Sequence, residues 1–490
     1  MQGEGEESGD KVMRKNNKPG RNYMKAIIPV IDEKSKRPYY LQLYDYIKNA
    51  VVSGEIQPGE KLPSLRNLAK HLKLSLTTID LAYSQLSVEG YIYSKPCSGF
   101  FAGDITFARP TEEIGALPSN SDFTESLLSK SLPPDQYDLS CFDFNKWKKC
   151  LNKILTEHPH LLLSESDPQG EQALRHEISK YLYRSRGVTC TPSQIVIGAG
   201  TQQITGQLSL LLSKMSISHV TVEDPCYLPV KNIFRDRGFA LSSVAVSKSG
   251  VDIQKLPANI KSAVYVCPSN QFPTGAVMPI GKRYELLEWA DRNDSIVIED
   301  DYDSELRYFG KPIPALKGLD TNKSVVYLSS FSSTLFPSIK ISYMVLPERA
   351  AEIFNSLKND YAQTCSKAEQ LTLALFMEYG YYQTNIRKLR SLYAQKLQAV
   401  LNSIHNYAHN FITPSNTSSG INMIIDVKSD KDINTLCREA SSVGASAVPI
   451  SVYTDDVKGS ALSLIFYYNQ IPLDRIDEVI KSLAYKWFKV

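Results

Sequence analysis

Acidic, hydroxyl and basic residues follow apolar segments in the middle of the chain, where they could bind a small ligand. The segment IVIEDDYDSELRY is an apolar run that ends in acids between Glu299 and Asp303. The next apolar run, Val325 to Leu328, leads into a serine-rich turn, and a third run from Ile339 to Leu346 contains Lys340. If the runs are strands, their polar ends are typical of ligand-binding positions. The alternative for the acids is a solvated loop.

Apolar segments alternate with helical patterns through the region that must position these residues. The segments IVIGAGTQQ, HVTVED, SAVYVCPSN, SIVIED and VVYLSS each predict a strand, and helical material lies between them. This alternation favours a mostly parallel sheet covered by helices over residues 137–360. After a long helical stretch, the strands INMIIDV, SAVPISVY and ALSLIFYY and a last helix from Leu473 to Trp487 predict a smaller α+β domain within residues 361–490.

Two central segments resemble fold-type I enzymes that use pyridoxal phosphate (PLP). They are IVIEDDYDSELRY and VVYLSSFSSTLFPSIKISYMVLP. They are most similar to the aminotransferase-like half of MocR/GabR-type bacterial regulators. The resemblance implies a phosphate site, a carboxylate that pairs with the ring nitrogen, groups that bond the ring oxygen, and an aromatic that stacks on the ring. The matching residues are Gly200, Thr201, Gln202, Ser330 and Lys340 for the phosphate, Asp300 for the nitrogen, Asn270 and Tyr302 for the oxygen, and Tyr227 for stacking.

The chain departs from the family pattern at several of these positions. Ser333 stands where the family has the lysine that binds PLP covalently, so no residue is predicted to be catalytic. Ser463 replaces an arginine that clamps a substrate carboxylate, and Glu165 replaces a tyrosine. Several changes around one pocket favour loss of aminotransferase chemistry, and the sequence does not tell whether Ser333 is natural or engineered. Non-covalent PLP, a different ligand and no ligand all stay open, as does Lys340 as a substitute lysine.

The first hundred residues carry a different signal. Residues 11–100 are strongly basic, whereas the rest of the chain is net negative, so a polyanion is the expected partner of this part. Within residues 37–103, helical spacing, two serine N-caps and two short strands around Pro96 to Gly99 predict a winged helix-turn-helix. A generic three-helix module is the alternative. Residues 1–36 are expected to be a disordered arm or cloning remnant, with Met24 as another start.

The segment PGEKLPSLRNLA and its surroundings resemble the GntR-type DNA-binding domain. The resemblance implies DNA contacts from the helix starts, from one arginine and from the wing. The matching residues are Ser64, Arg66, Ser75, Thr77, Thr78, Ser98 and Gly99. Leu76 stands where the family has an arginine, and Cys97 stands where it has a glycine, so the operator sequence is not predicted.

The remaining features bound the function. Residues 104–136 are rich in Pro, Ser and acids and are expected to be a linker with a short helix near Phe123. Scattered cysteines and histidines predict neither disulfides nor a metal site, and no apolar run is long enough for a membrane span. The two resemblances imply a homodimeric regulator that binds double-stranded DNA and senses an amino acid, PLP or a related effector, and these features add the expectation that it is cytoplasmic. An aminotransferase with an accessory DNA-binding domain and a purely structural scaffold are the alternatives.

Overall fold

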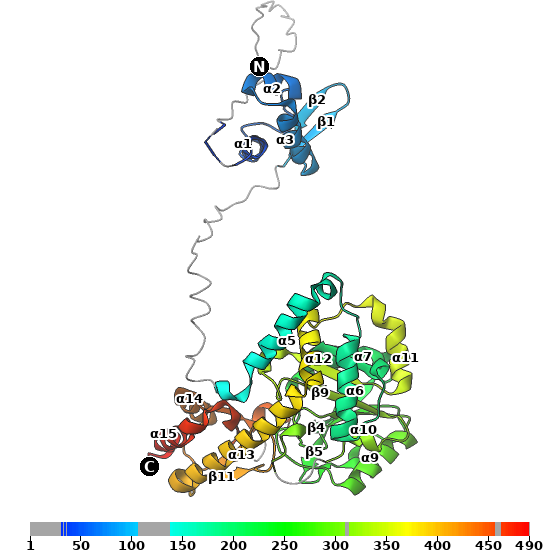
Figure 1. The fold of residues 1–490 in the computed structure, drawn as a ribbon, viewed down its shortest axis with the longest axis vertical. Helices are drawn as coiled ribbons and strands as arrows, with labels where there is room; N and C mark the ends of the chain where they lie inside the picture. The colour runs from blue at the N-terminus through cyan, green and yellow to red at the C-terminus, as the bar shows by residue number, and fades with distance from the viewer. Residues whose placement is uncertain are drawn as a thin grey trace, which may run out of the picture. The chain divides into compact units, whose positions relative to one another are not determined.

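The computed structural model describes residues 31–32, 34–35, 37–105, 138–308, 313–455 and 462–489 (Figure 1). The chain divides into two compact units, Met1–Glu125 and Ser126–Val490. Most of the expected N-terminal arm and of the linker, including its short helix, lies outside the described residues. Within the part of the chain that the structure describes, every helix is too short or too polar to cross a bilayer.

The first unit has the predicted winged helix-turn-helix plan. Its elements are α1 (Tyr39–Val52), α2 (Leu65–Leu72), α3 (Leu76–Val88), β1 (Ile92–Lys95) and β2 (Gly99–Ala102). The apolar faces of the three helices share one core, in which Leu43, Ile79 and Leu86 are fully buried. The strands pair antiparallel, with Ile92 opposite Ala102. The helical spacing of these apolar residues therefore does specify the fold of this unit.

The second unit is built on an eight-stranded sheet with the order β3-β10-β9-β8-β7-β4-β5-β6. The pairs among β9, β8, β7, β4 and β5 are parallel, whereas β10 and β6 run antiparallel to their neighbours. The sheet confirms the predicted fold-type I architecture. The strand bounds are β3 (Ile195–Ala199), β4 (His219–Asp224), β5 (Ala240–Ser247), β6 (Gly250–Val251), β7 (Ala263–Val266), β8 (Ile296–Asp300), β9 (Val325–Ser330) and β10 (Ile341–Val345).

Helices cover both faces of this sheet, which explains why its central strands are apolar on both sides. One face packs against α7, α8 and α11, and the other against α5, α6 and α12 at one end and α9 and α10 at the other. The helix bounds are α5 (Phe144–Glu157), α6 (Gln172–Arg186), α7 (Gly200–Lys214), α8 (Leu228–Asp236), α9 (Ile280–Arg292), α10 (Leu316–Leu319), α11 (Glu348–Leu357) and α12 (Lys367–Glu378).

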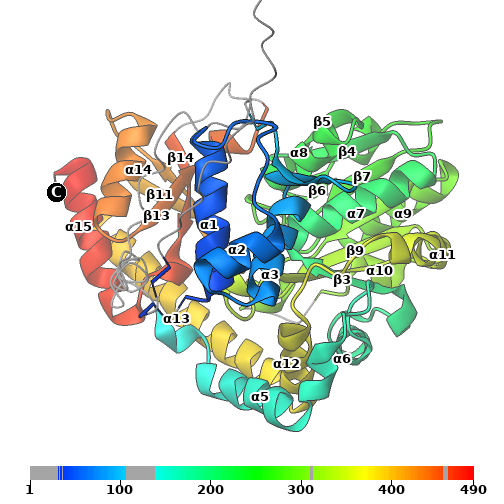
Figure 2. The ribbon, with the colours of Figure 1, turned by 90° about the horizontal axis from the view of Figure 1, so that it is seen from above.

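The long helix α13 (Tyr381–Ala408) leads from the large sheet to a smaller C-terminal domain, drawn in orange and red in Figure 2. This domain has an antiparallel sheet of order β11-β12-β14-β13 with its own core, which α13, α14 and α15 help to form. Its bounds are β11 (Ile412–Ser415), β12 (Met423–Val427), α14 (Ile433–Ser442), β13 (Ser446–Pro449), β14 (Leu462–Tyr467) and α15 (Ile476–Phe488). The predicted last helix therefore begins later, because Leu473–Arg475 form a 3-10 turn.

Candidate ligand pocket and nucleic-acid interface

The acids that follow strand β8 are buried. Glu299, Asp300, Asp301 and Asp303 each keep between 0% and 7% of their surface exposed. Glu299 accepts hydrogen bonds from two backbone N–H groups at the start of α10, at 2.7 and 2.8 Å. Asp301 binds the buried guanidinium of Arg186, with Nε 2.8 Å from Oδ2. The alternative of a solvated acidic loop is wrong, since these carboxyl groups are structural or face an interior site.

Asp300 lies at the carboxyl end of β8, where the resemblance places the partner of a ring nitrogen. Its Oδ2 accepts a hydrogen bond from the hydroxyl of Tyr265, which is 1% exposed on the neighbouring strand β7. Burial raises the pKa of Asp300 to about 7, and the hydrogen bond from Tyr265 offsets part of that effect. A cationic nitrogen placed against this carboxyl group would favour its charged form.

Asn270, Tyr302 and Ser333 lie together beside Asp303. The amide Nδ2 of Asn270 donates to both oxygens of Asp303 at 2.9 Å and lies 3.4 Å from the Tyr302 hydroxyl. The hydroxyl of Ser333 donates to the Tyr302 carbonyl at 2.5 Å. Ser419, from the segment before β12, donates to Asn270 Oδ1 at 3.1 Å. The three predicted residues therefore converge, but their polar groups already bind protein partners.

The predicted phosphate residues come from α7 and from the β9–β10 turn. Gly200 begins α7 with φ +85°, and a side chain added there would lie 3.9 Å from Cδ of Lys340. Thr201 and Gln202 occupy the first turn of this 15-residue helix, whose N–H groups suit an anion. Ser330, at the end of β9, is half-buried and accepts a hydrogen bond from the Ser332 N–H at 3.2 Å. The helix start and Lys340 thus share one edge of the sheet.

Aromatic rings form a wall next to these groups. The ring of Phe272 lies 5.9 Å from that of Tyr227, 6.1 Å from that of Tyr302 and 5.0 Å from that of Tyr453, all edge to face. Tyr227 is 37% exposed, so one face of the wall is open to a ligand. Tyr453 belongs to the C-terminal domain, and its carbonyl accepts from the Cys226 N–H at 2.9 Å. Sequence reasoning missed Tyr265, Phe272 and Tyr453, although Phe272 lies directly before a proline in a polar segment.

These residues fit PLP. The open start of α7 and Lys340 would hold its phosphate, Asp300 would face its ring nitrogen, and Tyr227 would cover its ring. When bound, PLP supplies an electron-withdrawing ring to an attached amine. Among the described residues, no group of three or more His, Cys, Asp or Glu side chains is placed to hold a metal ion.

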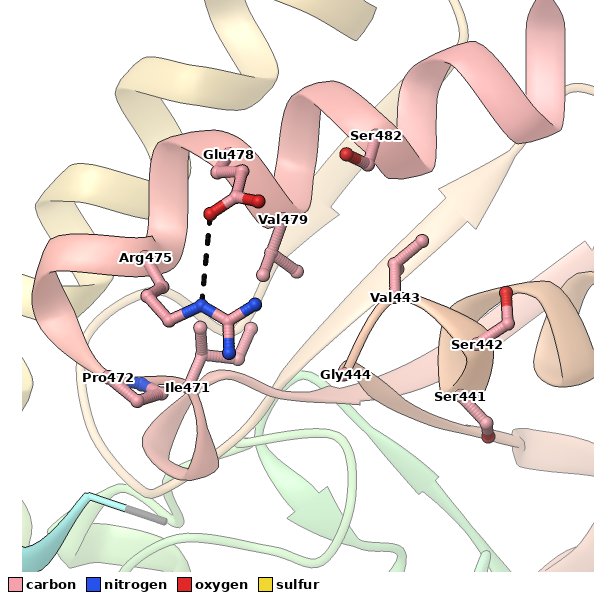
Figure 3. Close-up of a pocket in the computed structure, with 10 residues that line it drawn as sticks. All are labelled: Ser441, Ser442, Val443, Gly444, Ile471, Pro472, Arg475, Glu478, Val479 and Ser482. Atoms are coloured by element: carbon pink, nitrogen blue, oxygen red, sulfur yellow. Dashed lines mark ion pairs between the residues drawn. The ribbon is translucent and has the colours of Figure 1, made fainter. Parts of the chain in front are cut away.

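A separate cavity of about 310 Å³ lies in the C-terminal domain, between the end of α14 and the start of α15 (Figure 3). Arg475 in its wall pairs with Glu478 at 3.8 Å. The hydroxyls of Ser441 and Ser442 donate to carbonyls within α14. None of the predicted ligand residues lines this cavity, and its polar groups are mostly satisfied by their own helices.

The predicted DNA-contacting residues lie on the helix-turn-helix and its wing. The hydroxyls of Ser64 and Ser75 accept from the backbone N–H groups of Asn67 and Thr78, at 3.3 and 3.1 Å, and so cap α2 and α3. The hydroxyl of Thr78 is within 2.7 Å of that of Ser75. The exposed residues of the set are Ser64, Arg66, Ser75, Thr77, Ser98 and Gly99.

The start of α3, the predicted recognition helix, and the β1–β2 wing have features that the sequence did not predict. Leu76, the first residue of α3, is 47% exposed, so it offers an apolar surface where the family pattern has a charge. Cys97 adopts φ +58° in the turn, a backbone region that favours glycine, the residue expected there. Lys61 and Lys95 lie over the ring of Phe101, at 5.9 and 4.8 Å from its centroid. Sequence reasoning had not singled out these two lysines.

Comparison with known families supports the fold of both units. Residues 39–102 match the model of "Bacterial regulatory proteins, gntR family", and residues 136–435 match "Aminotransferase class I and II". The chain therefore belongs to the regulators of the MocR/PdxR type, in which a gntR-family DNA-binding domain is joined to an aminotransferase class I and II domain.

Named relatives share this organisation along most of their length. The chain is 37% identical over 468 residues to "Uncharacterized HTH-type transcriptional regulator YdeL" of Bacillus subtilis, covering 94% of this chain and 99% of that protein. It is 30% identical over 445 residues to "HTH-type pyridoxine biosynthesis transcriptional regulator PdxR" of Corynebacterium glutamicum, covering 90% and 94%. It is 28% identical to the "Probable rhizopine catabolism regulatory protein MocR" of Rhizobium meliloti, covering 86% and 88%.

Solved structures support the fold of the second unit. A kynurenine aminotransferase from Pyrococcus horikoshii superimposes with a TM-score of 0.62 at 23% identity, covering 78% of this chain and 98% of that chain. An archaeal alanine:glyoxylate aminotransferase superimposes with a TM-score of 0.65 at 21% identity, covering 74% of this chain and 93% of that chain. At this level of identity the likeness concerns the fold alone.

Proposed function

We propose that the protein is a transcription regulator whose aminotransferase-like unit binds a small effector without catalysing a reaction. The observation that carries this proposal is the set of polar and aromatic residues that gathers at one edge of the large sheet, which we call the cofactor-like pocket and define by Gly200, Lys340, Asp300, Tyr302 and Tyr227. It has the start of helix α7, whose N–H groups suit an anion, a buried carboxyl group and an aromatic wall, whereas the side chain at position 333 is a hydroxyl bonded to the Tyr302 carbonyl. A hydroxyl in that place cannot hold an aldehyde as an amine does. The ligand we favour is PLP bound non-covalently, or an amino acid or PLP-like compound.

Contacts between the large sheet and the C-terminal domain support a sensing role. Besides the Tyr453 contact, the buried ammonium of Lys231 on α8 pairs with Asp455. Ser243 on β5 donates to the same carboxylate at 2.8 Å. A ligand on the aromatic wall would therefore touch both domains and favour one relative position of them.

Melting temperature and borohydride reduction test the ligand proposal. On addition of PLP, we expect a rise in melting temperature, and borohydride treatment should leave no PLP on the protein after denaturation. Lys340→Gln should weaken the PLP-dependent rise, and Arg292→Gln, on the exposed surface of α9, should not. PLP that stays attached after reduction and denaturation would contradict non-covalent binding. No response to PLP, amino acids or their PLP adducts would instead favour a structural scaffold.

DNA binding is tested by replacing Arg66 in the intact chain. Arg66→Ala should weaken binding to DNA from upstream of the protein's own gene by about 1–3 kcal/mol, since one charged contact is lost. If Arg66 binds a phosphate, the slope of log affinity against log salt should also fall by about 1. Arg292→Ala, which removes an exposed arginine paired with Glu288, is the control. Equal affinity of Arg66→Ala and the unmodified protein at moderate salt would contradict the assigned interface.

A further inference from the structure

A groove between α6 and α13 gathers arginine side chains away from the cofactor-like pocket. Its inner part is a cavity of about 250 Å³, and an adjoining cavity of about 380 Å³ shares several of the same wall residues. We call it the arginine groove and define it by Arg184, Ser304, Gln383, Arg387 and Arg390. None of the residues predicted to bind PLP lines either cavity.

The cations of this groove lack compensating charges. Among the described residues, Arg184, Arg387 and Arg390 have no carboxylate within ion-pair distance. Within the described structure, the guanidinium of Arg387 donates to the Thr384 hydroxyl at 3.2 Å, and Nε of Arg390 donates to the Glu305 carbonyl. Guanidinium groups that share a wall repel one another, so an anion between them would be stabilised.

The acid in the inner wall is already bonded within the protein. Glu305 is 6% exposed, and its Oε1 accepts from the Tyr181 hydroxyl at 3.1 Å. Burial and the nearby Asp301 charge raise its pKa, so its carboxyl group resists ionisation. The adjoining cavity has two acids: Glu177 is paired with Lys180 at 2.7 Å, and Glu378 is exposed and has no ion pair among the described residues.

One unpartnered donor in the wall suits an anionic ligand. The hydroxyl of Ser304 is buried without a hydrogen-bond partner in the described structure, and this residue keeps only 9% of its surface exposed. Buried polar groups of this kind cost free energy unless a ligand or water satisfies them. A serine hydroxyl can donate to an anion that three arginines hold.

We propose that the arginine groove binds a small phosphate-bearing anion, either free phosphate or a phosphate monoester. Planar guanidinium groups bind phosphate oxygens in pairs, and the inner cavity has room for such a group. Ser304 begins the turn that follows Asp303, and Asp303 is bonded to Asn270 in the cofactor-like pocket. An anion in the groove would therefore restrain the segment that joins both sites.

The test uses the full chain carrying Lys340→Gln, so that the predicted phosphate position of the other pocket does not contribute. Melting temperature is followed with inorganic phosphate and, separately, with glycerol 3-phosphate, against chloride at equal ionic strength. At least one of the two should raise the melting temperature, and the preferred one identifies free phosphate or a monoester. Adding Arg184→Gln and Arg387→Gln should lower the apparent affinity about tenfold or more, because two charged contacts are lost.

Arg292→Gln in the same background is the matched control and should keep the full response. Arg184, Arg387 and Arg292 are exposed, so replacing them leaves the core intact. A response to neither compound, or a response that survives the loss of Arg184 and Arg387, would overturn the proposal. Either result leaves the DNA and PLP tests unaffected, because those depend on other residues.

Discussion

Glu223 on β4 is a buried acid without a cationic partner. It is 2% exposed, and its Oε2 accepts from the Cys267 N–H at 3.0 Å, while its Oε1 has no partner in the described structure. Burial raises its pKa from 4.5 to about 7, and the Asp300 charge adds to the shift. Glu223 therefore stays protonated in the folded protein at pH values at which it is ionised in the unfolded chain.

This shift predicts a stability change with pH. Between about pH 4.5 and 7 the folded state binds a proton that the unfolded state lacks, so the contribution of Glu223 to the free energy of unfolding falls as pH rises. Glu223→Gln removes the titration. Relative to the unmodified protein, the variant should gain stability from pH 5 to 8, by up to about 3 kcal/mol. Urea unfolding at several pH values measures the difference.

Glu285→Gln, an exposed change on α9, is the matched control and should show no such trend. A constant difference between Glu223→Gln and the unmodified protein across this pH range would contradict the raised pKa. The measurement concerns one side chain, because Gln has the shape of Glu and keeps an acceptor for the Cys267 N–H.

At the scale of elements, local signals were predictable and long-range contacts were not. Ser64 and Ser75 were assigned as N-caps from residue type, and both accept the capping hydrogen bond, since this interaction needs only three residues of chain. Strand β5 was missed because its half-exposed, serine-rich segment lacks a clear apolar pattern. The contact of Phe272 with Tyr453 depends on how the two domains pack, which no local pattern encodes.

Helix α13 carries a lysine that is buried completely. Nζ of Lys396 lies 2.6 Å from Oδ2 of Asp138 and 2.7 Å from the Asn469 carbonyl, and 5.7 Å from the centre of the Tyr393 ring. The charge of Lys396 holds the pKa of Asp138 below its usual value. The pair thus fixes the beginning of the second unit's described chain to α13 and to the C-terminal domain.

Removing the lysine should destabilise the second unit. Lys396→Met leaves Asp138 buried without a counter-charge, and we expect a loss of about 3–5 kcal/mol in the free energy of unfolding. Lys388→Met, on the exposed side of the same helix, should change it by less than about 0.5 kcal/mol. Chemical denaturation of both variants measures the contrast. Similar stabilities of the two would mean that water can satisfy the Asp138 carboxylate in place of the ammonium.

At the scale of the whole molecule, the homodimer expected from the sequence can be tested at exposed apolar residues of the second unit. Leu163 is 90% exposed at the end of a 3-10 turn, and Tyr361 is 54% exposed. The segments that carry them are joined, because Nζ of Lys367 donates to the carbonyls of Ser164 and Glu165 at 3.3 and 3.0 Å. A single exposed apolar side chain does not by itself mark an interface, so Leu163 is offered as the position at which the expected dimer can be tested.

Leu163→Asp should therefore shift the protein from dimer to monomer, since a charge would be buried in the interface. On DNA with two half-sites, linkage through the dimer raises the effective concentration of the second DNA-binding unit, so the variant should bind about 10²-fold or more weakly. Mass photometry measures the oligomeric state, and fluorescence anisotropy measures the affinity. Ile280→Asp, at an exposed position of α9, should remain dimeric and bind normally. A dimeric Leu163→Asp protein with unchanged affinity would exclude this surface as the interface, and a monomeric one with unchanged affinity would show that each unit binds DNA independently.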